Sequence, residues 1–199
     1  DVALLTQYLP FSLNEHIGSG KPWDFDRRDS GIALLQPHEK PDGQVWYTGT
    51  ADAVKQNIEY IKRKNPEYVI ILSGDHIYKM NYNWMIEDHK KNNAELTIAV
   101  KTVPWEETNR FGIFEVDDTK QILGFEEKPK EPKNNLASMG IYIFNWGRLR
   151  NVLMNSHTKE NDMNDFGKNV IPFYLDSGEN VVADRFSGYW KDVGTIDSL

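Results

Sequence analysis

Short apolar runs alternate with segments of helical periodicity in the first half of the chain. Two segments, residues 52–64 and 82–92, carry apolar side chains at helical spacing and predict helices. Continuous apolar runs predict strands at residues 2–5, 31–35, 68–72 and 96–100. The run YVIIL at 68–72 is typical of a strand buried on both faces of a parallel sheet. This order of strands and helices predicts a parallel sheet with crossover helices.

The pattern changes in the second half. Two apolar segments, residues 111–116 and 122–128, flank the polar break DDTKQ and predict a β-hairpin. Further strands are expected at 139–144 and 181–186, helices at 146–154 and 165–175, and a polar loop at 129–136. The whole pattern predicts a two-part α/β fold, with a mixed, mostly parallel sheet flanked by helices and an antiparallel insertion after the parallel core.

Composition and charge exclude several classes of protein. Apolar residues make up 39% of the chain and charged residues 27%, which is a globular balance. Lys plus Arg is 23 and Asp plus Glu is 30, so the net charge is −7, which argues against nucleic acid or an anionic membrane as a partner. There is no cysteine, which excludes disulfides, thiolate catalysis and cysteine-based zinc sites. No apolar run approaches the roughly 20 residues of a membrane span, so we expect a cytoplasmic protein.

The two ends of the chain interrupt predicted elements. An apolar run begins at Val2, and the chain stops just after Gly194 and Thr195, a pair typical of the start of another element. We therefore expect an internal piece of a longer protein, the alternative being a natively processed domain.

The segment SGDHIYKMNY at 73–82 is the first candidate for chemistry. Asp75 follows the predicted strand 68–72, and ligands of open α/β sheets bind beyond the carboxyl ends of strands. Gly74 leaves room for a ligand, and a carboxylate here suits Mg²⁺. The alternative is a helix cap at Asp75. The five histidines show no metal-binding spacing. For the neighbouring His76 two roles therefore remain: it orients Asp75, or it is a surface residue.

Three further segments carry candidate residues. In WYTGTADAV at 46–54, Gly49 and Thr50 precede a predicted helix whose free N–H groups suit a phosphate or a base edge, unless this is only a capped helix start. In FEEKP at 125–129, Lys128 suits a substrate phosphate and Glu127 suits sugar hydroxyls, unless the charges are only a solvated cluster. In GYWKDVGT at 188–195, Asp192 offers a second carboxylate that completes a metal site if the fold brings it to Asp75.

Taken together, the motifs resemble the nucleotidyltransferases that make nucleotide sugars, and among these the bacterial glucose-1-phosphate adenylyltransferases. The forms GTADA and GDHIYKM resemble this adenylyl branch more than the thymidylyl, uridylyl or guanylyl branches. The resemblance spans the chain through LTQYLPFSLNEHIGSGKPWDFDR at 5–27, WYTGTADAV at 46–54, SGDHIYKMNY at 73–82, RFGIFEVD at 110–117, FEEKP at 125–129, ASMGIYIF at 137–144, DFGKNVIP at 165–172 and GYWKDVGTI at 188–196.

The resemblance implies a reaction and a set of roles. Glucose 1-phosphate attacks the α-phosphate of ATP and gives ADP-glucose and pyrophosphate, with Mg²⁺ and without a covalent enzyme intermediate, in glycogen biosynthesis. The roles that it implies are metal ligands at Asp75 and Asp192, a sugar-phosphate contact at Lys128, a nucleotide site at Tyr47, Gly49 and Thr50, a glucose site at Gly112, Glu127, Ser138 and Tyr142, and packing behind the metal at Trp190.

The chain departs from the family pattern in two places. The Gly-rich loop with its catalytic Arg is absent from the sequence, as is the C-terminal left-handed β-helix that carries tetramer contacts and allosteric control. We therefore expect residues 1–199 to be an incomplete catalytic domain with little or no turnover alone, from a parent that is a homotetramer or a heterotetramer. The alternatives are a non-catalytic regulatory subunit of the same enzyme, a nucleotide-sugar pyrophosphorylase for another base or sugar, and a sugar-binding module without chemistry.

Overall fold

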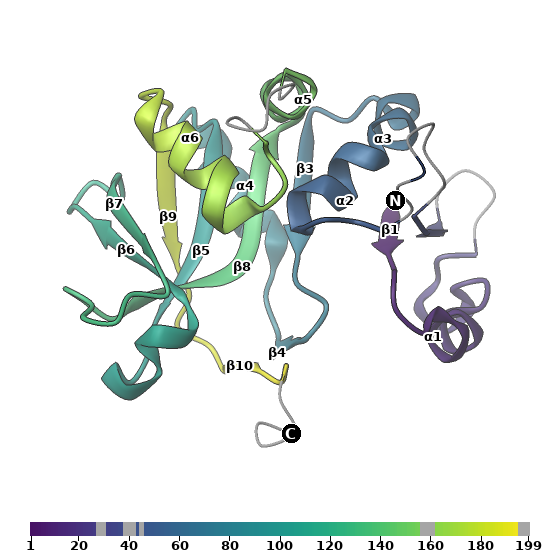
Figure 1. Cartoon of the computed structure of the whole chain (residues 1–199), viewed down its shortest axis with the longest axis horizontal. Coiled ribbons are helices and arrows are strands. Elements are labelled where there is room, and N and C mark those ends of the chain that lie inside the picture. Colours follow the sequence, from purple (N-terminus) through teal and green to yellow (C-terminus); the bar gives the residue numbers. More distant parts are fainter. Residues whose placement is uncertain (27–30, 38–42, 44–45, 156–161, 195–199) are drawn as a thin grey trace. The chain divides into compact units, whose positions relative to one another are not determined.

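A computed structural model describes residues 1–26, 31–37, 43, 46–155 and 162–194 (Figure 1). The chain divides into two compact units. Unit 1 comprises residues 1–65 and 163–165, and unit 2 comprises residues 66–162 and 166–199. Among the described residues no helix is both long enough and apolar enough to cross a lipid bilayer.

Unit 1 contains a small parallel sheet. Strands β1 (Val2–Leu5) and β2 (Ile32–Leu35) pair in parallel with Val2 opposite Ile32, at the two places where the apolar runs predicted strands. Helix α1 (Pro10–Ile17) follows β1 and has no buried residue, and the 3-10 turn η1 (Lys21–Trp23) comes after it.

The helix predicted at 52–64 is two shorter helices. Helix α2 (Thr50–Gln56) and helix α3 (Ile58–Lys64) meet at Asn57, whose φ of −107° is not helical. The side chain of Asn57 is buried and donates hydrogen bonds to the Ala53 carbonyl at 2.8 Å and to the Tyr47 hydroxyl at 3.0 Å. A side-chain amide that bonds to the preceding turn competes with the backbone ladder, which explains the break.

Unit 2 is built on a six-stranded mixed sheet. The strand order is β7-β6-β8-β5-β9, and β3 pairs with β8 as well. Strand β8 pairs antiparallel with each of β3, β5 and β6, and β5 pairs in parallel with β9. The strands are β3 (Tyr68–Leu72), β5 (Leu96–Thr102), β6 (Gly112–Val116), β7 (Ile122–Glu127), β8 (Leu136–Asn145) and β9 (Val181–Arg185). The predicted α/β class with a mixed sheet is therefore confirmed.

The strands β3 and β5 run in the same direction, as predicted, but they are not neighbours. The carboxyl-terminal half of β8 pairs with β3 along one edge and with β5 along the other, so β8 lies between them. The strand β3 is only partly buried, although the run YVIIL predicted burial on both faces. A strand from a later part of the chain has taken the place of the predicted parallel neighbour.

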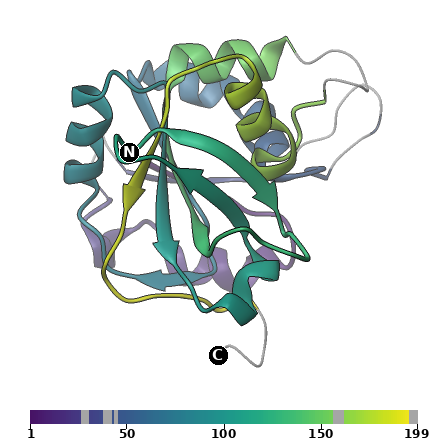
Figure 2. The same cartoon turned by 90° about the vertical axis from the view of Figure 1, so that its left-hand side faces the viewer.

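Helices cover both faces of this sheet. Figure 2 shows α4 (Tyr82–Lys91) on one side of it and α6 (Ile171–Asp176) on the other. Met85 of α4 belongs to the same buried cluster as Met139, Ile141 and Ile143 of β8. The side chain of Phe144, on the opposite face, packs against Phe166 and Tyr174, with ring centroids 5.5 Å apart in each pair. Helix α5 (Trp146–Met154) and the π-helical turn η4 (Phe166–Val170) complete that layer.

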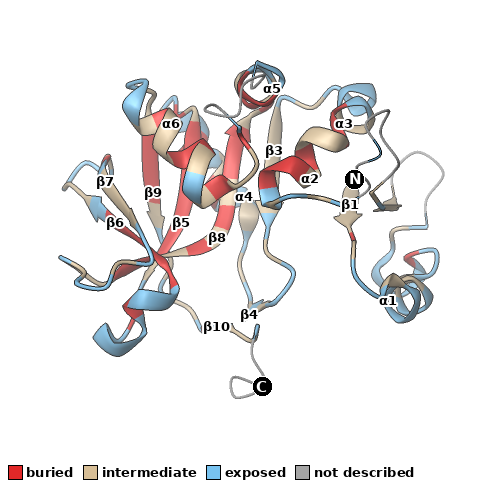
Figure 3. Ribbon diagram, viewed as in Figure 1, coloured by how far each residue is buried: buried red, intermediate tan, exposed pale blue. Residues whose placement is uncertain are grey.

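The strands at the centre of unit 2 are almost fully buried (Figure 3). Leu96, Ile98 and Val100 of β5 have no exposed surface, and neither do Ile141 and Ile143 of β8. Burying each such side chain stabilises the fold by about 1.5–3 kcal/mol. The sheet is therefore a stable support for the loops at its edges.

The predicted hairpin is present as β6 and β7. A carboxylate oxygen of Asp117 accepts hydrogen bonds from the backbone N–H of Thr119 and of Gln121 and from the Thr119 hydroxyl, which closes the turn. These hydrogen bonds hold the pKa of Asp117 below its ordinary value. The 3-10 segment η2 (Trp105–Arg110) leads into β6.

A short ribbon that the sequence did not predict joins two distant segments of unit 2. Strand β4 (His76–Tyr78) pairs antiparallel with β10 (Trp190–Asp192), and Asp192 lies opposite His76. Trp190 anchors β10 because it is buried against His76 and Phe111, with ring centroids 5.2 Å apart in both pairs. This ribbon positions the candidate site.

Candidate active site

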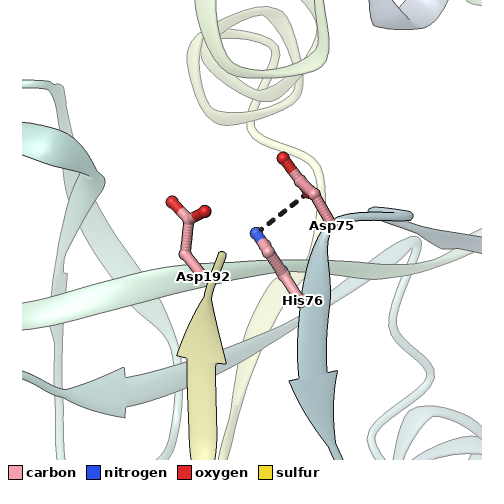
Figure 4. A group of neighbouring side chains, drawn as sticks. All are labelled: Asp75, His76 and Asp192. Carbon is pink, nitrogen blue, oxygen red and sulfur yellow. Dashed lines mark ion pairs between the residues drawn. The ribbon is translucent and has the colours of Figure 1, made fainter. Parts of the chain in front are cut away.

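Two carboxylates from opposite ends of unit 2 meet at the β4–β10 ribbon. Asp75 immediately precedes β4, and its carbonyl accepts the N–H of Val193 at 2.9 Å. Asp192 ends β10. One potential ligand atom from each of Asp75, His76 and Asp192 lies within 4.8 Å of the other two (Figure 4). The fold thus brings together the pair of carboxylates on which a shared metal site depends.

A glycine keeps the space beside the carboxylates open. A Cβ on Gly194 would lie 3.0 Å from Oδ1 of Asp192 and 3.1 Å from Oδ2 of Asp75. The Gly194 N–H also donates to Oδ1 of Asp192 at 2.8 Å, which orients that carboxylate. Two hard oxygen donors around a space that a methyl group would fill suit Mg²⁺, which takes one or two carboxylates and otherwise water or phosphate oxygens. The residues present therefore fit a magnesium ion.

His76 is part of this cluster. Its side chain is only 10% exposed, and Nδ1 lies 2.8 Å from the Met139 carbonyl oxygen. The indole N–H of Trp190 is 3.4 Å from the same nitrogen. The carbonyl contact is shorter and a carbonyl only accepts, so Nδ1 carries the proton. Nε2 faces Asp75, 3.5 Å from Oδ1. The sequence left His76 as an orienting or a surface residue, and the surface reading is wrong.

Arg110 is the charged neighbour that sequence reasoning missed. Its Nη2 lies 3.6 Å from Oδ2 of Asp192, and its guanidinium lies 5.5 Å from the ring centroid of Phe111. The Arg110 side chain is 38% exposed, so this ion pair adds little to stability. It matters as a positive charge beside a candidate metal ligand. Arg110 falls inside the motif RFGIFEVD, but no spacing in the sequence links it to Asp192.

The residues predicted for the sugar side lie on adjoining strands. Gly112 of β6 is opposite Glu127 of β7, and Ile113 is opposite Ala137 of β8, so Ser138 lies next to Gly112. The hydroxyls of Ser138 and Tyr142 are 3.4 Å apart. A Cβ on Gly112 would lie 2.5 Å from Cε2 of Phe125 and 3.0 Å from Oε2 of Glu127, so this position has no room for a side chain. The fold brings Gly112, Glu127, Ser138 and Tyr142 into one region of the sheet.

Lys128 follows β7 in a conformation that its residue type disfavours. Its φ is +48°, and its N–H donates to the Phe111 carbonyl at 3.1 Å. The left-handed region costs a residue other than Gly, Asn or Asp about 1–2 kcal/mol. Such strain is typical of positions that function requires. The side chain is exposed, so its ammonium group is accessible to a ligand.

The residues predicted for the nucleotide, Tyr47, Gly49 and Thr50, lie in unit 1. The N–H of Tyr47 donates to Oε1 of Gln7 at 2.6 Å, and burial raises the pKa of the Tyr47 hydroxyl. A Cβ on Gly49 would lie 2.4 Å from the Asn164 carbonyl oxygen, so only glycine fits. Gln7 is a neighbour that the sequence analysis did not single out.

The expectation of free N–H groups at the start of helix α2 is wrong. The N–H groups of Ala51 and Asp52 donate to the Asn164 carbonyl at 2.8 and 2.9 Å. The N–H of Thr48 donates to the Asp52 carboxylate at 2.9 Å, which ties the chain before the helix to its first turn. The carbonyl of Asn164 therefore takes two of the N–H groups that a phosphate or a base edge was expected to use.

The fold agrees with what comparison with known proteins finds. The family model for nucleotidyl transferases matches residues 1–199, and the chain belongs to the nucleotidyl transferase family. A solved structure from Bacillus anthracis, described as a glucose-1-phosphate thymidylyltransferase in complex with sucrose, is similar with a TM-score of 0.78. The likeness covers 100% of this chain and 72% of that one at 20% sequence identity, which establishes the shared fold.

Proposed function

We propose that this chain is the central part of the catalytic domain of a glucose-1-phosphate adenylyltransferase, which makes ADP-glucose from ATP and glucose 1-phosphate. The observation that carries the proposal is the meeting of Asp75 and Asp192 around the space that Gly194 leaves open. A non-catalytic subunit or a sugar-binding module has no need for two carboxylates held together at the cost of their mutual repulsion.

The reaction needs charge neutralisation and positioning rather than a nucleophile from the protein. A phosphate oxygen of glucose 1-phosphate forms a bond to the α-phosphorus of ATP, and the bond from that phosphorus to the oxygen bridging to the β-phosphorus breaks. Pyrophosphate leaves with the bonding electrons, and no atom changes oxidation state. When Mg²⁺ is bound to Asp75 and Asp192, it supplies positive charge beside the phosphates.

The other residues act on the sugar phosphate. The ammonium group of Lys128 pairs with the phosphate of glucose 1-phosphate and lowers its repulsion from ATP. The carboxylate of Glu127 accepts hydrogen bonds from sugar hydroxyls, and the hydroxyls of Ser138 and Tyr142, 3.4 Å apart, offer further partners. Because Gly112 has no side chain, the ring of Phe125 and the carboxylate of Glu127 lie close against β6, which places Glu127 for the sugar. Holding both substrates in line supplies much of the rate.

The choice of adenine rests on the motifs GTADA and GDHIYKM and on the segment of Tyr47, Gly49 and Thr50. A second candidate keeps the same chemistry but uses another nucleotide. It is favoured by the likeness to a structure described as a thymidylyltransferase. Both candidates share Asp75, Asp192 and Lys128 and differ only in the base pocket.

The test is pyrophosphate release by the natural full-length protein, with glucose 1-phosphate, Mg²⁺ and one of ATP, dTTP, UTP, GTP or CTP. We expect release with ATP to exceed that with any other nucleotide at least tenfold. In the variant Asp75→Asn we expect pyrophosphate release with ATP to fall at least a hundredfold. The matched control is Asp118→Asn, because Asp118 is an exposed carboxylate in the turn of the hairpin and has no assigned role.

The outcomes separate the candidates. Release with dTTP or another nucleotide above that with ATP contradicts the adenylyl choice and leaves the nucleotidyl transfer in place. The absence of release with every nucleotide, from a folded protein, supports the non-catalytic subunit. Equal loss in Asp75→Asn and Asp118→Asn contradicts the special role of Asp75.

A further inference from the structure

The imidazole of His76 is held on several sides in one orientation. Nδ1–H donates to the Met139 carbonyl at 2.8 Å, and the Trp190 ring packs edge-on at 5.2 Å. On a third side lies Gly140, with a φ of +64°, where a Cβ would lie 3.2 Å from Cε1 of His76 and 2.5 Å from Oγ of Ser73. The backbone of β8 thus makes room for this ring, and the fold fixes which nitrogen faces the carboxylates.

The nitrogen that faces the carboxylates, Nε2, receives no hydrogen bond from the described residues. Because Nδ1 carries the proton, the neutral ring has a lone pair on Nε2. Among the described residues no hydrogen bond reaches Nε2, and its polar neighbour is Oδ1 of Asp75 at 3.5 Å. A lone pair aimed at a carboxylate oxygen in a side chain that is nine-tenths buried is electrostatically unfavourable unless a proton or a metal ion lies between them.

We propose that His76 is a third protein ligand of the divalent cation, through Nε2, and that the site therefore favours Mn²⁺ and Co²⁺ over Mg²⁺. The inference rests on the proposed function because the other two ligands are Asp75 and Asp192. Imidazole nitrogen is a softer donor than oxygen and suits transition metals, whereas Mg²⁺ prefers oxygen. An Asp–His–Asp set thus gives transition metals an advantage that two carboxylates alone do not.

The spread of the three ligand atoms is compatible with one ion. Ligand atoms of one ion lie up to about 4.5 Å apart, since each bond is about 2.0–2.2 Å long. The atoms here lie within 4.8 Å of one another, and the Asp75 side chain is 60% exposed and free to turn. His76 is the fixed ligand, and the exposed carboxylate adjusts around it.

The test is electron spin echo envelope modulation of Mn²⁺ bound to the natural full-length protein, with Mn²⁺ and Mg²⁺ dissociation constants from titration. We expect ¹⁴N modulation from a coordinated imidazole in the wild type and its loss in His76→Gln. We expect the Kd for Mn²⁺ to rise at least about 10- to 100-fold in that variant, because that is the usual cost of losing only an outer-shell partner of a metal ligand. The Kd for Mg²⁺ rises less than threefold. His16→Gln, on helix α1 of unit 1, is the control and leaves both constants unchanged.

A second measurement needs no variant at His76. Labelling histidine with ¹⁵N replaces the ¹⁴N modulation with that of ¹⁵N in the wild-type protein, which supports imidazole coordination even if His76→Gln does not fold. Mn²⁺ binding that Asp75→Asn abolishes, without nitrogen modulation in the wild type, overturns the role of His76 and leaves the proposed function standing. Absence of any Mn²⁺ or Mg²⁺ binding overturns both.

Discussion

The guanidinium of Arg110 lies 3.6 Å from the carboxylate of Asp192, so a positive charge stands beside one of the two proposed metal ligands. This pair offsets part of the repulsion between Asp192 and Asp75 when the site holds no ion. It also opposes a cation that binds there.

Removing this charge is expected to tighten metal binding. A unit charge about 6 Å from a divalent ion, at an effective dielectric constant of about 60, is worth about 1.8 kcal/mol, or about a twentyfold change in affinity. We expect Arg110→Gln to lower the Kd for Mn²⁺ by about that factor, measured by titration at low salt. Arg110→Lys keeps the charge and is the control. Weaker binding in Arg110→Gln would show instead that Arg110 holds Asp192 in place.

Closing the space at Gly194 is expected to weaken metal binding. In Gly194→Ala the new Cβ would lie 3.0–3.1 Å from an oxygen of each carboxylate, so both must move apart. We expect the Kd for Mn²⁺ to rise at least tenfold by titration, with a free energy of unfolding within about 1 kcal/mol of the wild type. Gly147→Ala is the control, since a Cβ there meets no atom within 4 Å. Unchanged Mn²⁺ affinity in Gly194→Ala would exclude an ion between the carboxylates.

The backbone strain at Lys128 is expected to lower the stability of the fold, and its ammonium group is expected to bind glucose 1-phosphate. In Lys128→Gly the left-handed conformation becomes unstrained, so the free energy of unfolding by urea stays equal or rises by up to about 1 kcal/mol. The affinity for glucose 1-phosphate, measured by calorimetry, falls at least tenfold because the ammonium group is gone.

The matched control is Lys120→Gly, because Lys120 also has a positive φ, of +71°, in the turn of the hairpin. It pairs with Asp88 at 2.8 Å, away from the sugar-side residues. We expect the affinity for glucose 1-phosphate to stay unchanged in this variant. Equal losses in both variants would mean that backbone conformation, and not the ammonium group of Lys128, determines binding.

The buried His89 is expected to make the fold sensitive to mild acid. Its side chain has 1% of its surface exposed, Nδ1 pairs with the Thr97 hydroxyl at 2.7 Å, and burial lowers its pKa below 6.5. Because the unfolded chain binds this proton at a higher pH than the folded one, the contribution of His89 to stability is complete above about pH 6.5. It falls as the pH drops towards the folded-state pKa.

The check is the difference in free energy of unfolding between the wild type and His89→Gln at pH 7.5 and at pH 5.5. Other titrating groups are common to both proteins and cancel. We expect the advantage of the wild type to shrink by up to about 1.4 kcal/mol for each pH unit below 6.5. A constant difference across this range would mean that His89 does not titrate on unfolding.

Local patterns were enough to predict most of the strands and the hairpin, because burial imposes a periodicity that each segment carries by itself. They failed where the decisive partner was distant or was a single side chain. The predicted helix at 52–64 breaks because the side chain of Asn57 bonds to the preceding turn. The strand at 68–72 has β8 beside it because that strand returns from far along the chain.

The sequence alone determined which residues are able to do chemistry: Asp75 beyond a strand, Lys128 after the hairpin, and Asp192 beside a Val-Gly turn. Only the tertiary structure decided that Asp75 and Asp192 meet, that His76 turns Nε2 towards them, and that Arg110 stands beside them. The physical reason is that β4 and β10 are each three residues long and far apart in the chain. So short a strand has no periodicity of its own, and its partner is selected by the packing of Trp190 against His76 and Phe111.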